Sequence, residues 1–377
     1  MSKNLNLKNE KEACLVLAWI SDSTDLESQI KAQKSGYSNL ISEILDTPAK
    51  TPRQKRRQNR LKQINEIEQL FKIMEKTEIK FLSRIDEKYP SSLNDLGLEK
   101  CWGIFYQGDL ELLQNLAVGI VGTRKSTVYG NSIAGEIAFD LASSGVTVIS
   151  GGASGIDTAA HFGALNANGK TICVQANGLD KKYPSKNELL FEKIQGRGLL
   201  VSEYPPGRTP LRHSFLARNR IIAALSKGVV VVEADLISGA ISTANHANRL
   251  NRNVMAFPGN INSPKSAGCH NLVKSHQAEL VTSAADILEL ISPIGINNQK
   301  SKEITSKFDT LEPEIKEFYG YLHLDNMKTY SELAKQSGFD ELEVIKFLQT
   351  LQQNNFAYEI ENSWGLVKGV ETRGDLV

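Results

Sequence analysis

Short apolar runs alternate with helix-length amphipathic segments through the middle of the chain. The runs end in glycine, proline or small polar residues, and they are AVGIVGTR (117–124), GVTVISGG (145–152), KTICVQANG (170–178), GLLVSEYPPG (198–207), GVVVVEADLISG (228–239) and NVMAFPG (253–259). Between them lie segments such as STVYGNSIAGEIAFDLASSG (126–145) and GIDTAAHFGALNANG (155–169). Strands that alternate with helices form parallel neighbours joined by crossovers, and uninterrupted apolar strands are buried on both faces. The pattern predicts an α/β fold with a doubly wound, mostly parallel sheet, whose strand ends collect ligands.

Composition limits the kinds of molecule that a protein with this fold could bind. The chain has 377 residues, with 44 basic against 43 acidic side chains, so a polyanion has to be met by a local patch rather than by net charge. The absence of a long apolar run predicts no membrane segment, and we expect a cytoplasmic protein. Cys14, Cys101, Cys173 and Cys269 lie far apart, which argues against disulfides and zinc and favours a buried thiol at Cys173.

The length predicts several domains. Residues 1–80 have helical periodicity and include a basic run (53–76) that is either a nucleic-acid-touching arm or, as we favour, a solvated face or a link. Residues 81–292 hold the alternating pattern, and residues 293–310 form a polar linker. Residues 311–370 read as three amphipathic helices and a terminal hairpin, a small winged-helix-like domain. Its third helix is not basic, which favours protein docking over reading a DNA groove.

The turn after the first central strand is a candidate phosphate site. Gly122, Thr123 and Arg124 end the strand, and Ser126 or Thr127 is placed to cap the next helix. A guanidinium beside free helix amides favours an anion, but a surface loop arginine is an equally good interpretation.

The turn SGGASGID (150–157) does not have the spacing of a dinucleotide site. We expect Gly151, Gly152 and Gly155 to be structural glycines that allow close packing of helix on strand. Asp157 and His161 are four residues apart and could pair, but without further ligands a metal is improbable, and a satisfied, partly buried histidine is the favoured interpretation.

Two further segments carry cations. GLDKKYPSKN (178–187) has a lysine cluster and Asn187 before a helix, and SFLARNRIIAALS (214–226) places Arg218, Asn219 and Arg220 together. The arginines could form a second phosphate contact or an internal ion pair with Glu203 or Glu233.

The ordered series VGTR, SGGASGIDTAAH, GLDKKYPSKN, SEYPPG, FLARNRIIAALS, VVVVEADLISGAISTA and PGNINSPKSAGCHNLVK resembles the DNA-processing protein A family, DprA, also called Smf. The resemblance runs from about Phe81 to Leu290. It implies an extended Rossmann fold that binds single-stranded DNA, forms homodimers and helps to load the RecA recombinase onto incoming DNA during natural transformation. It implies no chemical step, no cofactor and no metal.

The resemblance also implies a set of DNA-contacting residues. They are Gly122, Thr123, Arg124 and Lys125, then Lys182, Lys186 and Asn187, then Arg218, Asn219 and Arg220, and finally Ser238 and Gly239. Which of Lys181, Lys182 and Lys186 contacts DNA stays open. A single-strand binder can add an aromatic on which a base stacks, and Phe191 or Tyr183 could supply it.

Two other function classes compete with DNA binding. A nucleotide phosphoribohydrolase of the same fold superfamily carries a glutamate in the strand-to-helix turn, where this chain reads SGAISTANHA (238–247) without one. A protein-docking scaffold is the other class, supported by the C-terminal module. A dehydrogenase is disfavoured because the dinucleotide fingerprint is missing.

Overall fold

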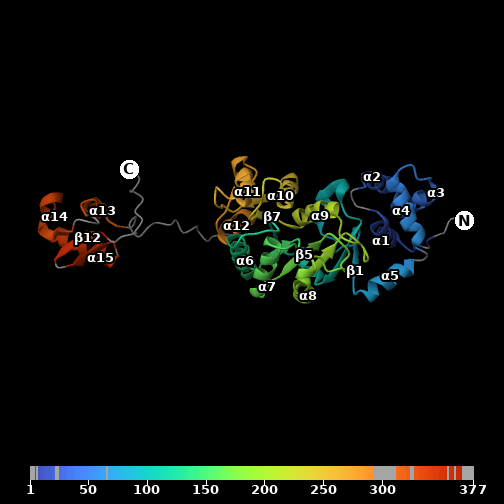
Figure 1. Ribbon diagram of the computed structural model, residues 1–377, viewed down its shortest axis with the longest axis horizontal. Helices are drawn as coiled ribbons and strands as arrows, with labels where there is room; N and C mark the ends of the chain where they lie inside the picture. Colours follow the sequence, from blue (N-terminus) through green and yellow to red (C-terminus); the bar gives the residue numbers. More distant parts are fainter. Residues whose placement is uncertain are drawn as a thin grey trace. The chain divides into compact units, whose positions relative to one another are not determined.

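The computed structural model describes residues 5, 7–21, 25–64, 67–292, 311–322, 327–354, 356–360 and 362–366. The chain divides into two compact units, residues 1–293 and 294–377 (Figure 1). The predicted linker at 293–310 lies outside the described residues, as do the gaps within the predicted 1–80 and 311–370 segments. The boundaries at 80, 292 and 310 therefore stay predictions.

A nine-stranded sheet organises the first unit, in the order β1-β2-β6-β5-β4-β3-β7-β8-β9. The strands are β1 (Lys80–Ser83), β2 (Gly103–Gly108), β3 (Ala117–Val121), β4 (Thr147–Ser150), β5 (Thr171–Gln175), β6 (Leu199–Ser202), β7 (Gly228–Val231), β8 (Asn253–Ala256) and β9 (Glu279–Leu280). Strands β3 to β9 pair in parallel, while β1 and β2 are antiparallel additions at one edge. The predicted doubly wound, mostly parallel sheet is confirmed, and each apolar run of the sequence contains a strand.

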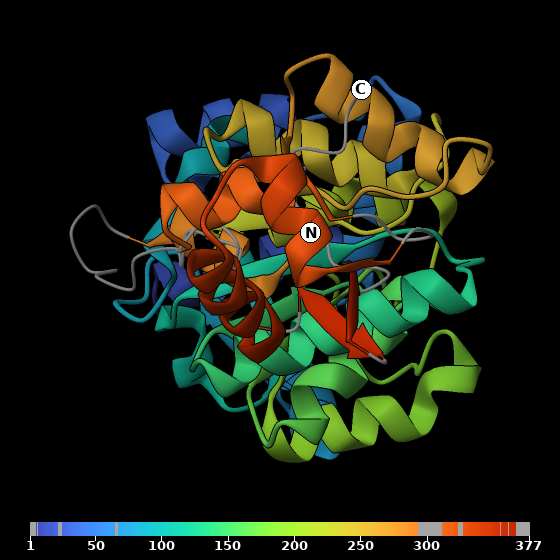
Figure 2. The same cartoon turned by 90° about the vertical axis from the view of Figure 1, so that its left-hand side faces the viewer.

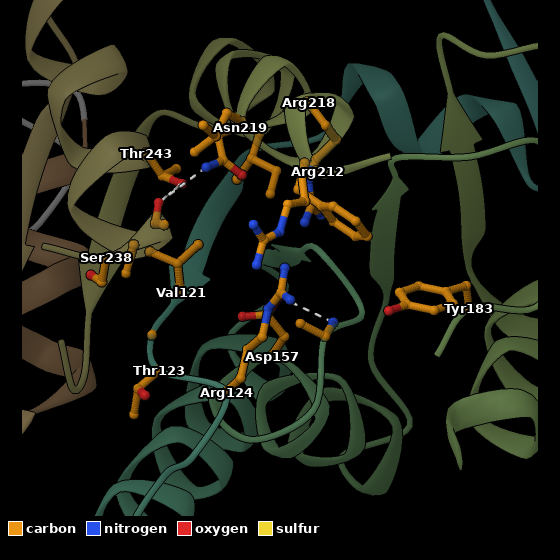
Figure 3. A pocket seen from close by; sticks show the side chains of 17 residues that line it. Val121, Thr123, Arg124, Asp157, Tyr183, Arg212, Arg218, Asn219, Ser238 and Thr243 are labelled. Atoms are coloured by element: carbon orange, nitrogen blue, oxygen red, sulfur yellow. Dashed lines mark hydrogen bonds between the residues drawn. The ribbon is translucent and has the colours of Figure 1, made fainter. Parts of the chain in front are cut away.

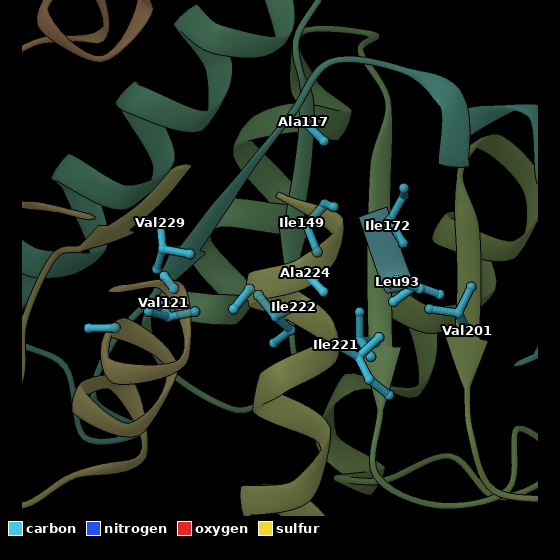
Figure 4. Close-up of a cluster of buried hydrophobic side chains, with 14 of the residues drawn as sticks. Leu93, Ala117, Val121, Ile149, Ile172, Val201, Ile221, Ile222, Ala224 and Val229 are labelled. Atoms are coloured by element: carbon cyan, nitrogen blue, oxygen red, sulfur yellow. The ribbon is translucent and has the colours of Figure 1, made fainter. Parts of the chain in front are cut away.

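Helices cover both faces of this sheet. One face carries α9 (Arg212–Leu225), α10 (Gly239–Arg249) and α11 (Pro264–Lys274), and the other carries α6 (Val128–Ser143), α7 (Ile156–Asn166), α8 (Glu188–Arg197) and α12 (Ala284–Ile291) (Figure 1). Figure 4 shows how α9 is held, since Ile221 and Ile222 lie in the cluster that contains Val121, Ile172 and Val201 of the strands. Burial of such side chains contributes about 1.5–3 kcal/mol each, so the start of α9 is placed rigidly above the strand ends.

The N-terminal helices pack on the sheet instead of standing apart from it. They are α1 (Glu10–Ile20), α2 (Leu26–Ser35), α3 (Tyr37–Asp46), α4 (Pro52–Gln63) and α5 (Ile67–Lys76). Their buried side chains share one cluster with Phe105 and Leu200 of the sheet. Within the basic run, Arg57 pairs with Asp25 at 2.7 Å and Arg60 donates to the carbonyl of Ile20 at 3.1 Å, so part of that charge joins helices to one another.

The described residues of the second unit form three helices, α13 (Pro313–Tyr319), α14 (Tyr330–Ser337) and α15 (Glu341–Gln353) (Figure 2). Its sheet has three strands in the order β10-β12-β11, formed by β10 (Lys328–Thr329), β11 (Ala357–Ile360) and β12 (Ser363–Leu366). The predicted helices and hairpin are confirmed, and β10 adds the third strand of the winged-helix-like arrangement. Phe318, Val344 and Leu348 belong to its own core cluster.

Candidate functional site

The winding of the sheet creates a crevice at the carboxyl ends of β3 and β7. From β3 the chain proceeds to β4, β5 and β6 on one side, and β7 begins the other side, so the loops that leave β3 and β7 turn in opposite directions. Ligands of doubly wound sheets bind at such a switch point. A cavity of about 510 Å³ lies there (Figure 3). Its lining includes three arginines and one aspartate, namely Arg124, Arg212, Arg218 and Asp157.

The turn after β3 presents one exposed arginine. A Cβ on Gly122 would lie 2.4 Å from the side chain of Ile156, so only glycine fits between the turn and α7. The amide of Thr123 donates to the carbonyl of Glu233 at 2.7 Å, which ties the turn to the end of β7. Arg124 is exposed, and its guanidinium carbon lies 4.8 Å from the ring centroid of Phe215. A cation stacked on an aromatic ring keeps its hydrogen-bond donors available for an anion. Lys125, the next residue, is also exposed.

Thr127 is the N-cap residue of α6, and it also hydrogen-bonds to the carboxylate of Glu233. The hydroxyl of Thr127 accepts from the amide of Gly130 at 3.0 Å. Both the amide and the hydroxyl of Thr127 donate to Glu233, at 2.9 and 2.6 Å. Glu233 is thus held by the N-terminus of a helix, which is a favourable place for a negative charge. Of the two carboxylates that the sequence offered as ion-pair partners, Glu203 is the one that pairs with an arginine of α9, Arg220.

Arg218, Asn219 and Arg220 leave α9 in different directions. Arg220 makes a two-pronged ion pair with Glu203, at 2.9 and 2.8 Å, and its side chain is 1% exposed. The internal ion pair that the sequence left open is therefore present for Arg220, which has no surface for DNA in this conformation. Asn219 donates to the carbonyl of Gly239 at 3.0 Å and so joins α9 to the start of α10.

Arg218 lies buried under the cavity. Its guanidinium donates to the carbonyl of Val174 and lies against Gly151, where a Cβ would approach Nη1 to 1.8 Å. Its Nε has no hydrogen-bond partner among the described residues. Burial lowers the pKa of Arg218, and the negative charge of Asp157 opposes that shift. The lining of the site therefore includes two exposed arginines, Arg124 and Arg212, and one buried arginine, Arg218.

Aromatic rings border the cavity opposite α10. Tyr183 is 44% exposed, and its ring centroid lies 5.7 Å from that of Phe215. A smaller cavity of about 250 Å³ is also lined by Arg124, Tyr183 and Phe215. Phe191, the other predicted stacking residue, is fully buried beside Gly152. Of the two candidates, only Tyr183 lies where a base could reach it.

The lysine cluster lies beside the cavity and not in its lining. Lys186 is exposed, and Lys182 donates to the side chain of Gln195 at 3.5 Å. Asn187 is buried and donates to the carbonyl of Gly152 at 3.0 Å and to the hydroxyl of Thr158 at 2.8 Å. The structure thus gives Asn187 a role in holding the glycine turn.

At Gly151, Gly152 and Gly155 the turn has no room for a side chain. Gly152 and Gly155 have φ values of +68° and +84°, a region that favours glycine. A Cβ on Gly155 would lie 2.5 Å from the carbonyl oxygen of Thr123. The turn thus packs α7 against the turn after β3.

Asp157 and His161 do not pair. The ring of His161 is buried and its Nδ1 lies 2.7 Å from the hydroxyl of Thr171. Burial, together with the charge of Arg218, lowers the pKa of His161 to about 3, so this histidine is neutral. His161 is therefore a core histidine and pairs with Thr171 instead of Asp157, but it is fully buried and its Nε2 has no hydrogen-bond partner among the described residues, so the expected satisfied, partly buried histidine is only partly correct.

The cavity lining also contains residues that the sequence motifs did not indicate, among them one cation and one aromatic residue of α9. Arg212 and Phe215 both line the cavity from the first turns of α9. A helix that begins at the carboxyl edge of the sheet directs its first turns toward the ligand site. Arg212 and Phe215 come just before Arg218 in the sequence, and this position could have indicated that they lie at the site. Ser238 and Gly239, at the start of α10, line the cavity as well, and the hydroxyl of Ser238 caps the amide of Ile241 at 3.4 Å.

Fold and site together define a Rossmann-like α/β protein with an arginine-lined crevice at its switch point. A family model described as DNA recombination-mediator protein A matches residues 80–292, which is more than half of the chain. The chain belongs to this family, and the resemblance seen in the sequence is confirmed. Among the described residues, no helix has the length and apolar character needed to cross a membrane.

Curated relatives match the chain at about 40% identity. A DNA processing protein DprA of Mycobacterium tuberculosis is 41% identical over 252 residues, which cover 67% of this chain and 64% of the relative. A DNA processing protein DprA of Streptococcus pneumoniae is 42% identical over 206 residues, 55% of this chain and 72% of the relative. The chain spans about 64% of the length of the mycobacterial relative.

Solved structures of the family have the same fold. The X-ray structure of DNA processing protein A from Streptococcus pneumoniae superposes with a TM-score of 0.64 at 33% identity, over 75% of this chain and 98% of that one. DNA processing protein A from Helicobacter pylori, described for its single-stranded DNA binding mode, gives a TM-score of 0.52 at 32% identity, over 56% of this chain and 94% of that one.

Proposed function

We propose that this chain binds single-stranded DNA in the cavity at the switch point. The observation that carries the proposal is Arg124, an exposed guanidinium stacked on Phe215 where the loops after β3 and β7 diverge. Tyr183 and Phe215 offer rings to unpaired bases, which stack on aromatic side chains without regard to sequence. The Helicobacter pylori relative, described by its single-stranded DNA binding, supports this proposal.

The proposed contacts divide by their chemistry. Arg124, Lys125 and Arg212 are exposed cations that would neutralise phosphates. Gly122, Thr123, Ser238 and Gly239 border the cavity and would bring backbone close to the strand. Lys182 and Lys186 stay proposed contacts for DNA that continues past Tyr183. Arg218, Asn219 and Asn187 would act by shaping the site, because their side chains are buried and bonded to the surrounding backbone.

Family membership supports a wider proposal. We propose that the protein acts in the cytoplasm as a homodimer that protects incoming single-stranded DNA and helps to load RecA during natural transformation. Strand exchange by RecA on DNA that is already coated by a single-strand binding protein tests the loading step. Acceleration by this protein supports it, and no effect despite tight DNA binding contradicts it.

The binding proposal is tested by titrating fluorescent single-stranded and double-stranded oligonucleotides at two salt concentrations. We expect salt-sensitive binding that prefers single strands, because contacts with phosphates release counterions. Arg124→Ala should weaken it by about 1–3 kcal/mol, the range of charge-assisted hydrogen bonds.

Arg249→Ala is the matched control for this measurement. Arg249 is exposed at the last turn of α10, at the opposite edge of the sheet, so the variant loses the same charge far from the cavity. It should bind as the wild type does. Equal losses in the two variants would show a general charge effect, and no binding by the wild type would contradict the proposal.

The alternative is a nucleotide phosphoribohydrolase-like enzyme in the same cavity. Among the described residues that line the cavity, Asp157 carries the carboxylate. It accepts hydrogen bonds from the amides of Gly151 and Ala153 at 3.2 and 3.3 Å. A carboxylate held by the backbone in this way is badly placed to stabilise charge on a ribose. We propose that the chain is not an enzyme, and release of free base from nucleoside monophosphates would contradict this.

A further inference from the structure

The amino end of α7 is arranged like a phosphate-binding turn, but a carboxylate of the chain itself lies in it. The turn runs from the end of β4 through Gly151 and Gly152 into a helix of 11 residues. Such turns direct backbone N–H groups and the positive end of the helix dipole at an anion. Here the amides of Gly151 and Ala153 donate to Oδ2 of Asp157, which is 6% exposed.

A second, independent feature points to an anion at the same place. Arg218, which comes from α9 on the other side of the cavity, is 4% exposed and lies against Gly151. Its Nε has no hydrogen-bond partner among the described residues. A buried guanidinium with an unused donor is costly unless a negative charge lies nearby, and the negative charge of Asp157 acts on Arg218.

We propose that the amino end of α7 is a phosphate-type anion site that Asp157 fills from within the chain, so that the cavity rejects terminal phosphates and accepts the phosphodiester backbone at Arg124. The inference rests on the proposed binding of single-stranded DNA. A terminal phosphate carries nearly two negative charges at neutral pH and would compete with the carboxylate for the same amides. A phosphodiester carries one charge and can stay at the rim, so Asp157 sets the specificity by occupying the inner position.

The test removes the carboxylate and measures phosphate directly. Inorganic phosphate and AMP are titrated by calorimetry, at constant ionic strength, into the wild type, Asp157→Ala and Asp157→Asn. We expect Asp157→Ala to bind both ligands at least about tenfold more tightly than the wild type does. Asp157→Asn should gain much less, because its amide oxygen still fills the site and accepts from the same two N–H groups.

Asp140→Ala is the matched control. Asp140 is exposed near the end of α6, so this variant changes the net charge equally but away from the cavity, and it should bind phosphate no better than the wild type. No gain in a folded Asp157→Ala protein would overturn the proposal. Equal gains in the Ala and Asn variants would also overturn it, since they would show that charge alone, and not occupancy, excludes phosphate.

A measurement on the wild type keeps the proposal testable if Asp157→Ala does not fold. Oligonucleotides with and without a 5′-phosphate should bind equally, and AMP should not displace them. Displacement by AMP, or clearly tighter binding of the 5′-phosphorylated strand, would overturn the proposal. Failure of the wild type to bind any single-stranded DNA would instead remove the proposed function and leave the calorimetric result for phosphate standing.

Discussion

At the residue scale, contacts too close for a side chain explain why the turns around the site contain glycine. Gly151 faces Arg218, Gly152 faces Cys173 and Phe191, and Gly155 faces the backbone after β3. Each of these partners is distant in the sequence. The sequence therefore predicts that the glycines are structural, but it does not show which group lies where each side chain would be.

Gly151 offers a direct test of such a contact. Gly151→Ala should destabilise the protein by about 1–3 kcal/mol, as overpacking does, because the guanidinium of Arg218 that its Cβ would meet is buried and bonded to the carbonyl of Val174. In an Arg218→Ala background the same substitution should cost less, and urea unfolding of the four proteins measures the coupling. Gly196→Ala is the control, since its Cβ would meet nothing within 4 Å. Additive losses at Gly151 and Arg218 would contradict the assigned contact.

His161 predicts how stability depends on pH. Its pKa is lowered to about 3 in the folded protein, first by burial and then by Arg218, against about 6.5 in an unfolded chain. As the pH falls below about 6.5, His161 binds a proton in the unfolded chain but stays neutral in the folded protein. The free energy of unfolding therefore decreases as the pH falls. This histidine alone should remove about 1 kcal/mol between pH 7 and pH 5.5.

Unfolding in urea at several pH values checks this prediction. His161→Gln should lose that part of the pH dependence, whatever its stability at neutral pH. His246, whose pKa burial lowers to about 4, remains in both proteins and accounts for part of the remaining slope. An unchanged slope in the variant would show that His161 does not contribute.

At the scale of elements, α9 shows how one helix serves both stability and the site. Its first turns bring Arg212 and Phe215 to the cavity, while Arg220 on a different side forms the ion pair with Glu203 at the end of β6. The periodicity of α9 could be read from the sequence. Its orientation above the sheet could not, because it depends on how Ile221 and Ile222 pack on strands that are far apart in the chain.

The ion pair predicts a structural role for Arg220. Arg220→Met leaves Glu203 buried without its partner, and we expect a loss of about 3–5 kcal/mol in the free energy of unfolding. The double variant Glu203→Met/Arg220→Met should recover much of that loss, because both charges are removed together. A stable Arg220→Met protein that fails to bind DNA would contradict this assignment and return Arg220 to the DNA surface.

At the scale of the whole molecule, the two units have separate cores. The clusters of the first unit are formed by residues between Ala13 and Ile291, and the cluster of the second by residues between Leu311 and Leu366. The cavity is lined entirely by the first unit. Among the described residues, the core clusters around the nine-stranded sheet and the lining of the cavity are formed by the first unit.

Removal of the second unit tests this independence. A chain of residues 1–293 should keep the unfolding midpoint of the first unit and bind single-stranded oligonucleotides within about twofold of the full chain, since the core clusters and the cavity lining of the first unit contain residues of that unit. Circular dichroism during urea unfolding and the fluorescence titration measure both quantities. An unfolded or non-binding truncated protein would show that the C-terminal unit contributes to one of them.

The sequence by itself determined the class of fold, the strands that build it and the turns where a ligand would gather. Strand and helix periodicity are local properties, and the switch point follows from the order in which buried strands alternate with helices. Only the tertiary structure shows that three arginines of the expected DNA-contacting set have different roles. Arg124 is exposed, Arg218 is buried beneath the cavity, and Arg220 forms an ion pair. The role of Asp157 is also decided by the tertiary structure, because which amides its carboxylate reaches depends on how α7 closes against the end of β4. Charge and hydrogen bonding act through distances between groups that are remote in sequence, and only the packed fold sets those distances.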